Sequence, residues 1–143
     1  MFHVGIDISK FKHDCFIATN AGDKIGSFEF KNDHDGFQTL KKELESLGEQ
    51  SQIKIGFEST GHYGINLKSF LSKLGYTYLE FNPQLTSKFS KATSLRRAKT
   101  DKIDAKLIAS MLGHFDYKSL HTSFYHENDL KELVRLRDKY LES

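Results

Sequence analysis

Apolar and polar residues alternate in three short runs over residues 2–31 of the chain. The first run, Phe2–Ser9, has an aliphatic residue at every second position from Val4, with small or polar residues, among them Asp7, between them. Two similar runs, His13–Asn20 and Lys24–Lys31, follow after short turn signals. Because a period of two is the pattern of a half-buried strand and the links are tight, we predict three strands in an antiparallel meander.

From Asn32 onward the apolar residues take the three- and four-residue steps of amphipathic helices, and further strand patterns lie between them. Strands are predicted over Ile53–Glu58 and Tyr76–Phe81, and helices over 32–47, over 65–74, from Pro83, from Asp101 to near Gly113, and over 127–141. A meander followed by strand–helix alternation predicts an α/β fold with a mixed five-stranded sheet and helices on both faces. Ligands of such sheets bind at the carboxyl ends of the strands.

Two acidic residues stand at the carboxyl ends of predicted strands, although acids are depleted in strands generally. Asp7 lies near the end of the first strand, where its neighbours on the same face are small, and Glu58 is the last residue of the fourth. If these two strands are parallel neighbours, the two carboxylates lie side by side.

Asp101 and Asp104 are three positions apart at the predicted start of a helix. Residues with this spacing share a helix face, and a helical wheel places both on the apolar side, with Lys102, Lys106 and Ser110 opposite. One interpretation is that the two acids favour the helix N-terminus and cap it. The alternative is that two carboxylates on a buried face, which repel each other and lose hydration, share a divalent cation.

Four carboxylates would meet if this helix packs across the strand ends that carry Asp7 and Glu58. Such hard oxygen donors suit Mg²⁺ or Mn²⁺. Two ions held in this way can activate a water or hydroxyl and stabilise the leaving oxygen of a phosphodiester. The sequence has no histidine–cysteine set with zinc spacing, no Walker-type loop and no serine–histidine elbow.

Positive charge is concentrated between Ser87 and Lys106, although the whole chain carries only +2. This segment carries +5 and the remainder −3; its basic residues are Lys88, Lys91, Arg96, Arg97, Lys99, Lys102 and Lys106. A local basic segment suits a polyanion such as nucleic acid. The alternative is a solvated helix face whose lysines serve solubility.

The composition is that of one ordinary globular domain: 143 residues, 28% charged, 13% aromatic and one proline. A single cysteine, Cys15, excludes a disulfide within the chain and a cysteine-rich zinc site. No apolar run approaches the length of a membrane span. We therefore expect a soluble cytoplasmic protein without a membrane partner.

Three motifs carry a family resemblance: Gly5–Lys10 (GIDISK), Gly56–Tyr63 (GFESTGHY) and Arg96–Ala105 (RRAKTDKIDA). Their order and spacing resemble the N-terminal domain of the DEDD-type insertion-sequence transposases, relatives of the Piv site-specific invertase with a RuvC-like, RNase H-type fold. The resemblance covers nearly the whole chain. It implies that Asp7, Glu58, Asp101 and Asp104 form the catalytic, metal-binding tetrad with Mg²⁺ or Mn²⁺ as cofactor. DNA would be the partner, with nucleic-acid contacts from Lys10, Lys88, Lys91, Arg96, Arg97, Lys99 and Lys102.

Members of this family also carry a C-terminal domain with a serine thought to act as nucleophile, and nothing in this chain matches it. We expect residues 1–116 to form the catalytic domain, and 117–143 a connector and the start of a long helix toward that missing domain. Ser59 is not assigned the nucleophile's role. The resemblance extends to systems guided by a structured RNA, so RNA is a second expected partner, and a homo-oligomer is expected for the full-length protein.

Two hypotheses from other classes stay open at this point. The chain could be a nucleic-acid-binding or assembly module without activity of its own, whose acids organise the fold. It could also be half of an actin- or sugar-kinase-type ATPase, because Gly5–Ser9 resembles the phosphate-binding first strand of that superfold. The chain is short for the second hypothesis, which also leaves the basic segment unexplained.

Overall fold

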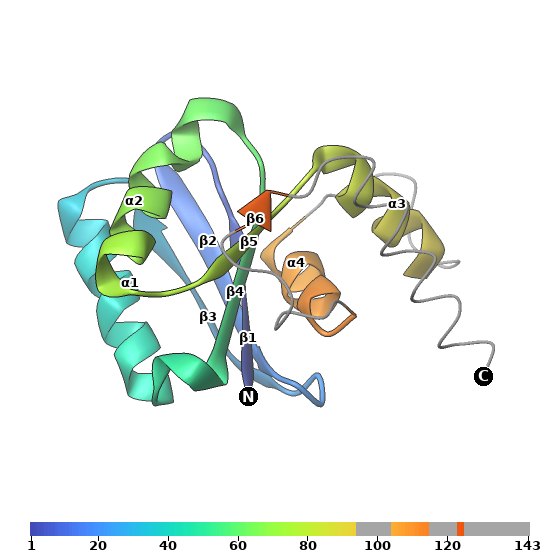
Figure 1. Ribbon diagram of the computed structural model, residues 1–143, viewed down its shortest axis with the longest axis horizontal. Coiled ribbons are helices and arrows are strands. Elements are labelled where there is room, and N and C mark those ends of the chain that lie inside the picture. Colours follow the sequence, from blue (N-terminus) through green and yellow to red (C-terminus); the bar gives the residue numbers. More distant parts are fainter. Residues whose placement is uncertain (94–103, 115–122, 125–143) are drawn as a thin grey trace.

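The computed structural model describes residues 1–93, 104–114 and 123–124 (Figure 1). In chain order the elements are β1 (Phe2–Asp7), β2 (Lys12–Thr19), β3 (Lys24–Lys31), α1 (His34–Leu47), β4 (Ile53–Glu58), α2 (Ile65–Leu74), β5 (Tyr78–Phe81), α3 (Pro83–Thr93), α4 (Ala105–Leu112) and β6 (Ser123–Phe124). Two short 3₁₀ turns, η1 (Gln50–Gln52) and η2 (Gly61–Gly64), precede β4 and α2.

The strands form one mixed sheet in the order β3-β2-β1-β4-β5-β6. The first three strands pair antiparallel, which confirms the predicted meander. β1 and β4 pair in parallel and are neighbours at the centre of the sheet, and β5 pairs in parallel with β4. The five predicted strands are therefore all present, and each of their bounds lies within two residues of the expected one.

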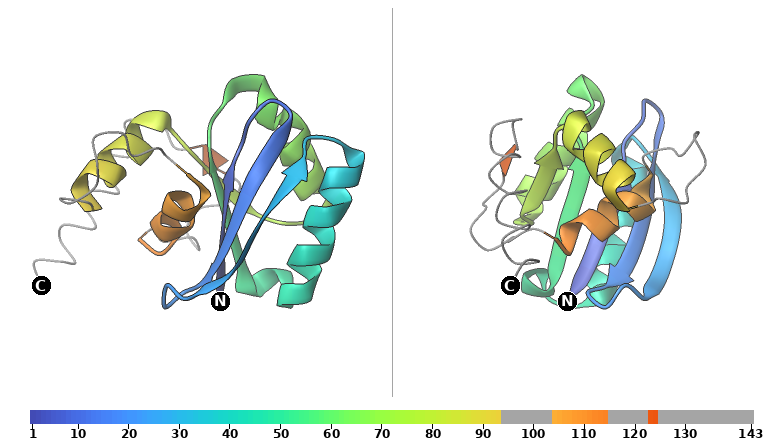
Figure 2. Two further views of the ribbon diagram at one scale, coloured as in Figure 1. Left: turned by 180° about the vertical axis from the view of Figure 1, so that it is seen from behind. Right: turned by 90° about the vertical axis from the view of Figure 1, so that its right-hand side faces the viewer.

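Helices cover both faces of the sheet, as predicted (Figures 1 and 2). On one face, α1 and α2 bury Leu40, Leu44, Leu67 and Leu71 against the aliphatic side of the central strands. On the other face, α3 and α4 form a second cluster with β5. The apolar side of the predicted 101–114 helix is buried as expected, because Leu107, Ile108, Met111 and Leu112 are all at most 2% exposed.

Two glycines in adjacent strands allow α4 to lie directly on the sheet. Gly5 and Gly56 are paired across β1 and β4. A Cβ atom on Gly5 would lie 2.2 Å from the carbonyl oxygen of Ala105 and 2.5 Å from the backbone nitrogen of Ala109. On Gly56 it would lie 2.7 Å from Leu112 Cδ2. The first glycine thus determines where the N-terminal end of α4 is seated, which is the end that carries Asp104.

Two expectations about the C-terminal part have different outcomes. Ser123–Phe124 forms β6, which pairs with β5, whereas a connector was expected there. The edge of β5 presents unpaired backbone groups, so a two-residue segment can pair with it although its own sequence has no strand pattern. The helix predicted over 127–141 lies outside the described residues. Within the described part of the chain, no helix combines the length and apolar character needed to cross a bilayer.

Candidate metal centre

Asp7 and Glu58 lie next to each other at the carboxyl ends of β1 and β4. The parallel register pairs Ile6 with Phe57, and each acid follows directly. Neighbouring strands are about 4.8 Å apart, and side chains alternate between faces. Both acids therefore project from the face that carries Gly5 and Gly56, which is the face covered by α3 and α4, and both are half-buried.

A hydroxyl from α3 contacts Glu58. The Thr86 side chain is fully buried, and its Oγ1 lies within hydrogen-bonding distance of Glu58 Oε2 and of the Pro83 carbonyl oxygen, the latter at 2.9 Å. A hydroxyl has one proton, so it donates to one of these acceptors at a time. When it donates to Glu58, it fixes one carboxylate oxygen and leaves the other for a ligand. Thr86 was not among the predicted site residues. The only hint of its role in the sequence is that a polar residue stands on the buried face of an amphipathic helix, beside Leu85 and Phe89.

We expect Thr86→Val to weaken divalent-metal binding while preserving the fold, because valine fills the same space without a donor. Loss of a group that orients a liganding carboxylate typically costs about 10- to 100-fold in metal affinity. Titration of the purified variant with Mn²⁺, followed calorimetrically, measures this, and Thr86→Ser should bind nearly as well as wild type. Equal Mn²⁺ affinities for Thr86→Val and wild type would show that Thr86 does not contribute to the metal site.

Asp104 is not where the helical wheel placed it. It precedes α4 as the N-cap, with extended backbone (φ −122°, ψ 174°), and its Oδ1 accepts a hydrogen bond from the Leu107 backbone nitrogen at 2.9 Å. Its side chain is exposed, so the prediction that it lies on the apolar face within the first helical turn is wrong. Aspartate satisfies a free N–H group at a helix start, and the helix begins after it. The carboxylate keeps Oδ2 for another ligand.

The remaining predicted site residues divide between the described and undescribed parts of the chain. Asp101, Arg96, Arg97, Lys99 and Lys102 lie outside the described residues. Lys10, Lys88 and Lys91 are described, and all three are exposed. Lys88 and Lys91 are on α3, the helix that also carries Thr86, so they lie on the same side of the sheet as the acids.

One further acid belongs to this region and was missed. Asp14 on β2 is paired with Asp7 and is exposed on the same face. A recess of about 440 Å³ is lined by Asp14 and Glu29 from the sheet and by Asp104 and Lys106 from the start of α4, among others. The N-terminus of α4 therefore faces the acidic strands. In the sequence, Asp14 is an ordinary polar residue in an alternating strand, and only the register brings it beside Asp7.

The donor set fits a hard divalent cation, although the described residues do not by themselves complete a site. Asp7 and Glu58 offer carboxylate oxygens at one strand edge, and Asp104 lies on the same face of the sheet. Among residues 1–93, 104–114 and 123–124, no three histidine, cysteine, aspartate or glutamate side chains are grouped closely enough to hold a metal ion. A complete set of four carboxylates therefore also requires Asp101, which lies outside the described residues.

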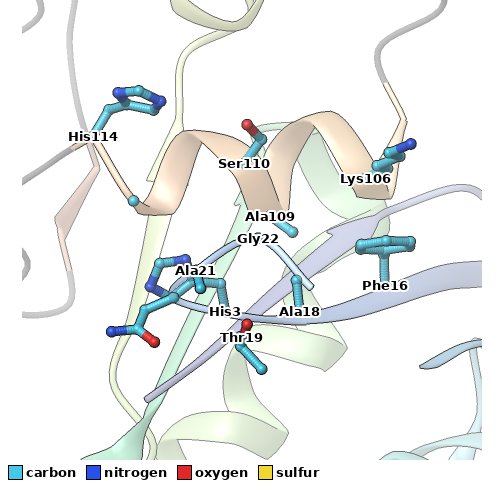
Figure 3. Close-up of a pocket in the computed structure, with 12 residues that line it drawn as sticks. His3, Phe16, Ala18, Thr19, Ala21, Gly22, Lys106, Ala109, Ser110 and His114 are labelled. Atoms are coloured by element: carbon cyan, nitrogen blue, oxygen red, sulfur yellow. The ribbon is translucent and has the colours of Figure 1, made fainter. Parts of the chain in front are cut away.

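A second cavity, of about 380 Å³, lies away from these acids, between α4 and the β2–β3 hairpin (Figure 3). Its lining includes His3, Lys106, Ser110 and His114, and none of the four predicted acids. Burial, followed by the positive charges of Lys54 and the N-terminus, lowers the pKa of His3 below its ordinary value. His3 is therefore a neutral imidazole at pH 7 and contributes hydrogen-bonding capacity rather than charge to this cavity.

Comparison with solved structures identifies the class of fold. The structure is similar to Thermus thermophilus RuvC, with a TM-score of 0.52 and 13% identity, covering 80% of this chain and 93% of that one. It is also similar to T. thermophilus RuvC in complex with a Holliday junction substrate, with a TM-score of 0.50 and 13% identity, covering 80% and 92%. This likeness shows a RuvC-like, RNase H-like fold.

The sequence itself identifies the family. The transposase family model DEDD_Tnp_IS110 matches residues 4–143. The chain therefore belongs to the DEDD transposase family of the IS110 type, which confirms the resemblance carried by the three motifs. A comparison with curated proteins gives no match.

Proposed function

We propose that this chain is the catalytic domain of a DNA transposase or site-specific recombinase whose strand cleavage and exchange depend on Mg²⁺ or Mn²⁺. The observation that carries the proposal is the adjacency of Asp7 and Glu58 on the face covered by α4, whose N-cap is Asp104. Family membership and the RuvC-like fold support the broader assignment to a transposase with a nuclease-type domain.

In this proposal Asp7, Glu58, Asp101 and Asp104 hold the metal. When bound there, a divalent ion supplies charge that stabilises a phosphodiester under attack and promotes ionisation of the attacking water or hydroxyl. Thr86 donates its proton to Glu58 and keeps that carboxylate oriented toward the strand edge. The buried contact of α4 with Gly5 holds Asp104 on the same face. Lys88 and Lys91 neutralise DNA phosphates, together with the basic residues before α4.

A nucleic-acid-binding module without its own activity is the second candidate. Two observations favour it: no three metal-binding side chains are grouped in the described part of the chain, and Asp104 has a structural role as a cap. The two candidates differ in one property, because only the first requires a divalent cation at Asp7 and Glu58. A guide RNA and a homo-oligomeric full-length protein are proposals that fit either.

The DNA-binding part of the proposal is tested by the salt dependence of binding. Each phosphate contact contributes about 0.9 to the slope of log K against log salt concentration for duplex DNA. We expect Arg96→Ala with Arg97→Ala to weaken binding and reduce the slope by about 2. Fluorescence anisotropy of labelled DNA from low to high salt measures both quantities.

The matched control is Lys42→Ala with Lys73→Ala, which removes the same charge from α1 and α2 on the opposite face of the sheet. This control should retain the wild-type slope. Equal slopes for wild type and the arginine variant, or equal losses in both double variants, would contradict a DNA-binding role for the basic segment.

A further inference from the structure

The turn between β1 and β2 presents an aromatic ring to solvent. Phe11 is 76% exposed, the largest exposed fraction among the large apolar side chains of the described residues. Exposing a phenylalanine forgoes roughly 1.5–3 kcal/mol of burial free energy. Phe11 lies at the end of the sheet where β1 ends and β2 begins, which is the end that carries Asp7 and Glu58.

The backbone under this ring is fixed by Asn32. The Asn32 backbone nitrogen donates to the Phe11 carbonyl oxygen at 2.8 Å, and its Nδ2 donates to the carbonyl oxygens of Lys10 at 3.1 Å and Tyr63 at 3.4 Å. One side chain thus connects the turn after β1 to η2, the turn that follows β4. These are the two loops that follow Asp7 and Glu58.

A buried histidine, His13, contacts the same turn from within the hydrophobic core. His13 is fully buried, and its ring packs edge-on against Phe30 at 5.2 Å between centroids and stacks on Phe37 at 6.5 Å. Its Nδ1 accepts a hydrogen bond from the Ser9 backbone nitrogen at 3.1 Å. The backbone of the turn that carries Phe11 is therefore fixed before any ligand arrives, which lowers the entropic cost of binding.

The surroundings of Phe11 are basic. Lys10 Nζ lies 5.1 Å from the centroid of the Phe11 ring, and Lys12 and Lys31 are exposed and paired across β2 and β3. Glu29 offsets one of these charges through an ion pair with Lys12 at 3.2 Å. An exposed aromatic ring beside lysines is the combination that binds unpaired nucleic-acid bases, because the ring stacks on a base while the lysines meet the phosphates.

We propose that Phe11 is a stacking platform for an unpaired DNA base next to the phosphodiester held at the candidate metal centre, with Lys10 contacting the adjoining phosphate. Phe11 is four residues beyond Asp7, and four extended residues span at most about 13 Å. The platform is therefore within a few nucleotides of the acids. This assignment rests on the proposed function, because it assumes that the substrate is a DNA strand.

The distribution of apolar surface favours a base over a second protein chain. A stable protein interface buries about 800 Å² on each partner. Ile25, the other strongly exposed apolar side chain of the meander, lies at the far end of β3, because β3 runs antiparallel to β2 and Lys31 is beside Lys12. At the Phe11 end of the sheet, Tyr63 and Ile65 are also exposed, at 38% and 54%, and Asn32 connects the Tyr63 backbone to the Phe11 turn. A few apolar side chains beside lysines suit a base and its phosphates better than a second protein chain.

The test uses the 143-residue chain and a single-stranded DNA that contains 2-aminopurine, with EDTA present so that binding is independent of catalysis. Stacking of 2-aminopurine on a ring quenches its fluorescence. We expect Phe11→Ala to lose this quenching and to bind roughly 5- to 150-fold more weakly. Phe11→Tyr should retain both properties, and Ile25→Ala, which removes an exposed apolar side chain at the other end of the meander, should behave as wild type.

Four outcomes would overturn the proposal. Wild-type affinity and quenching in Phe11→Ala would remove the platform and leave the proposed function intact, whereas a wild-type chain that binds no DNA would overturn both. An RNA of the same sequence that alone shows Phe11-dependent quenching would reassign the platform to RNA. Loss of self-association in Phe11→Ala by sedimentation, with unchanged DNA affinity for each chain, would assign Phe11 to a protein contact.

Discussion

Asp7→Asn should abolish the stabilisation that Mg²⁺ or Mn²⁺ confers on this protein, together with any metal-dependent DNA cleavage. A ligand at 100 times its Kd stabilises the folded state by about 2.7 kcal/mol. At roughly 3–4 °C per kcal/mol for a chain of this size, the wild-type melting temperature should rise by about 10 °C. The variant keeps the shape of the side chain but loses the charge that binds the cation, so its shift should be near zero.

The melting temperature of the metal-free variant gives a second readout. Asp7 and Glu58 are neighbouring half-buried carboxylates, so neutralising one relieves repulsion. Metal-free Asp7→Asn should therefore melt at or above the wild-type temperature. Asp23→Asn is the matched control, because Asp23 is an exposed acid in the turn between β2 and β3, and it should retain the full metal shift. A wild-type chain that gives no metal response would favour the inactive nucleic-acid-binding module.

Gly5→Ala should destabilise the fold by about 2–4 kcal/mol, a large effect for the addition of one methyl group. The new Cβ would meet the Ala105 carbonyl oxygen at 2.2 Å and the Ala109 backbone nitrogen at 2.5 Å. Both are backbone atoms and cannot rotate away, so α4 has to move off the sheet. Equilibrium urea denaturation measures the change. Because Asp104 moves with α4, the metal-induced shift should also fall.

Gly26→Ala is the control for this prediction. A Cβ on Gly26 in β3 meets no atom within 4 Å, so the free energy of unfolding should change by no more than about 0.5 kcal/mol. Wild-type stability in Gly5→Ala would show that α4 is not seated on β1, and the connection between Asp104 and the strand-end acids would be lost.

The sequence was most informative where one rule of local geometry was sufficient. Period-two alternation located β1 and β4, and the rule that acids are rare in strands singled out Asp7 and Glu58. Their adjacency needed only that the two strands be parallel neighbours, which the order of elements favoured and the sheet confirms.

The sequence failed where one pattern has two structural outcomes. An aspartate at the start of an apolar helical pattern can lie within the first turn of the helix, or it can precede the helix as its N-cap. Asp104 takes the second role, so α4 begins at Ala105, four residues after the expected start. The sequence could not distinguish the two, because aspartate is favoured both as an N-cap and within the first helical turn.

Residues whose role depends on distant partners were missed for a different reason. Thr86, Asp14 and Phe11 are unremarkable in their own segments: a threonine in a helix, an aspartate in a strand and a phenylalanine in a turn. The role of each depends on a contact with another element. Thr86 contacts Glu58, the strand register pairs Asp14 with Asp7, and Asn32 fixes the backbone of the turn that carries Phe11. Contacts between different helices, strands and turns leave no periodic signal in one sequence.

In the proposed site, acids from three separate segments share a divalent cation. A crystal structure of the chain soaked in Mn²⁺, with the ion located by anomalous scattering, would show whether they do. We expect an ion bound by Asp7 and Glu58 carboxylate oxygens at about 2.1–2.2 Å, with Asp101 and Asp104 in the same coordination sphere or bridging to a second ion. An ion bound elsewhere, or Asp101 and Asp104 held away from Asp7 and Glu58 in the metal-soaked crystal, would contradict it.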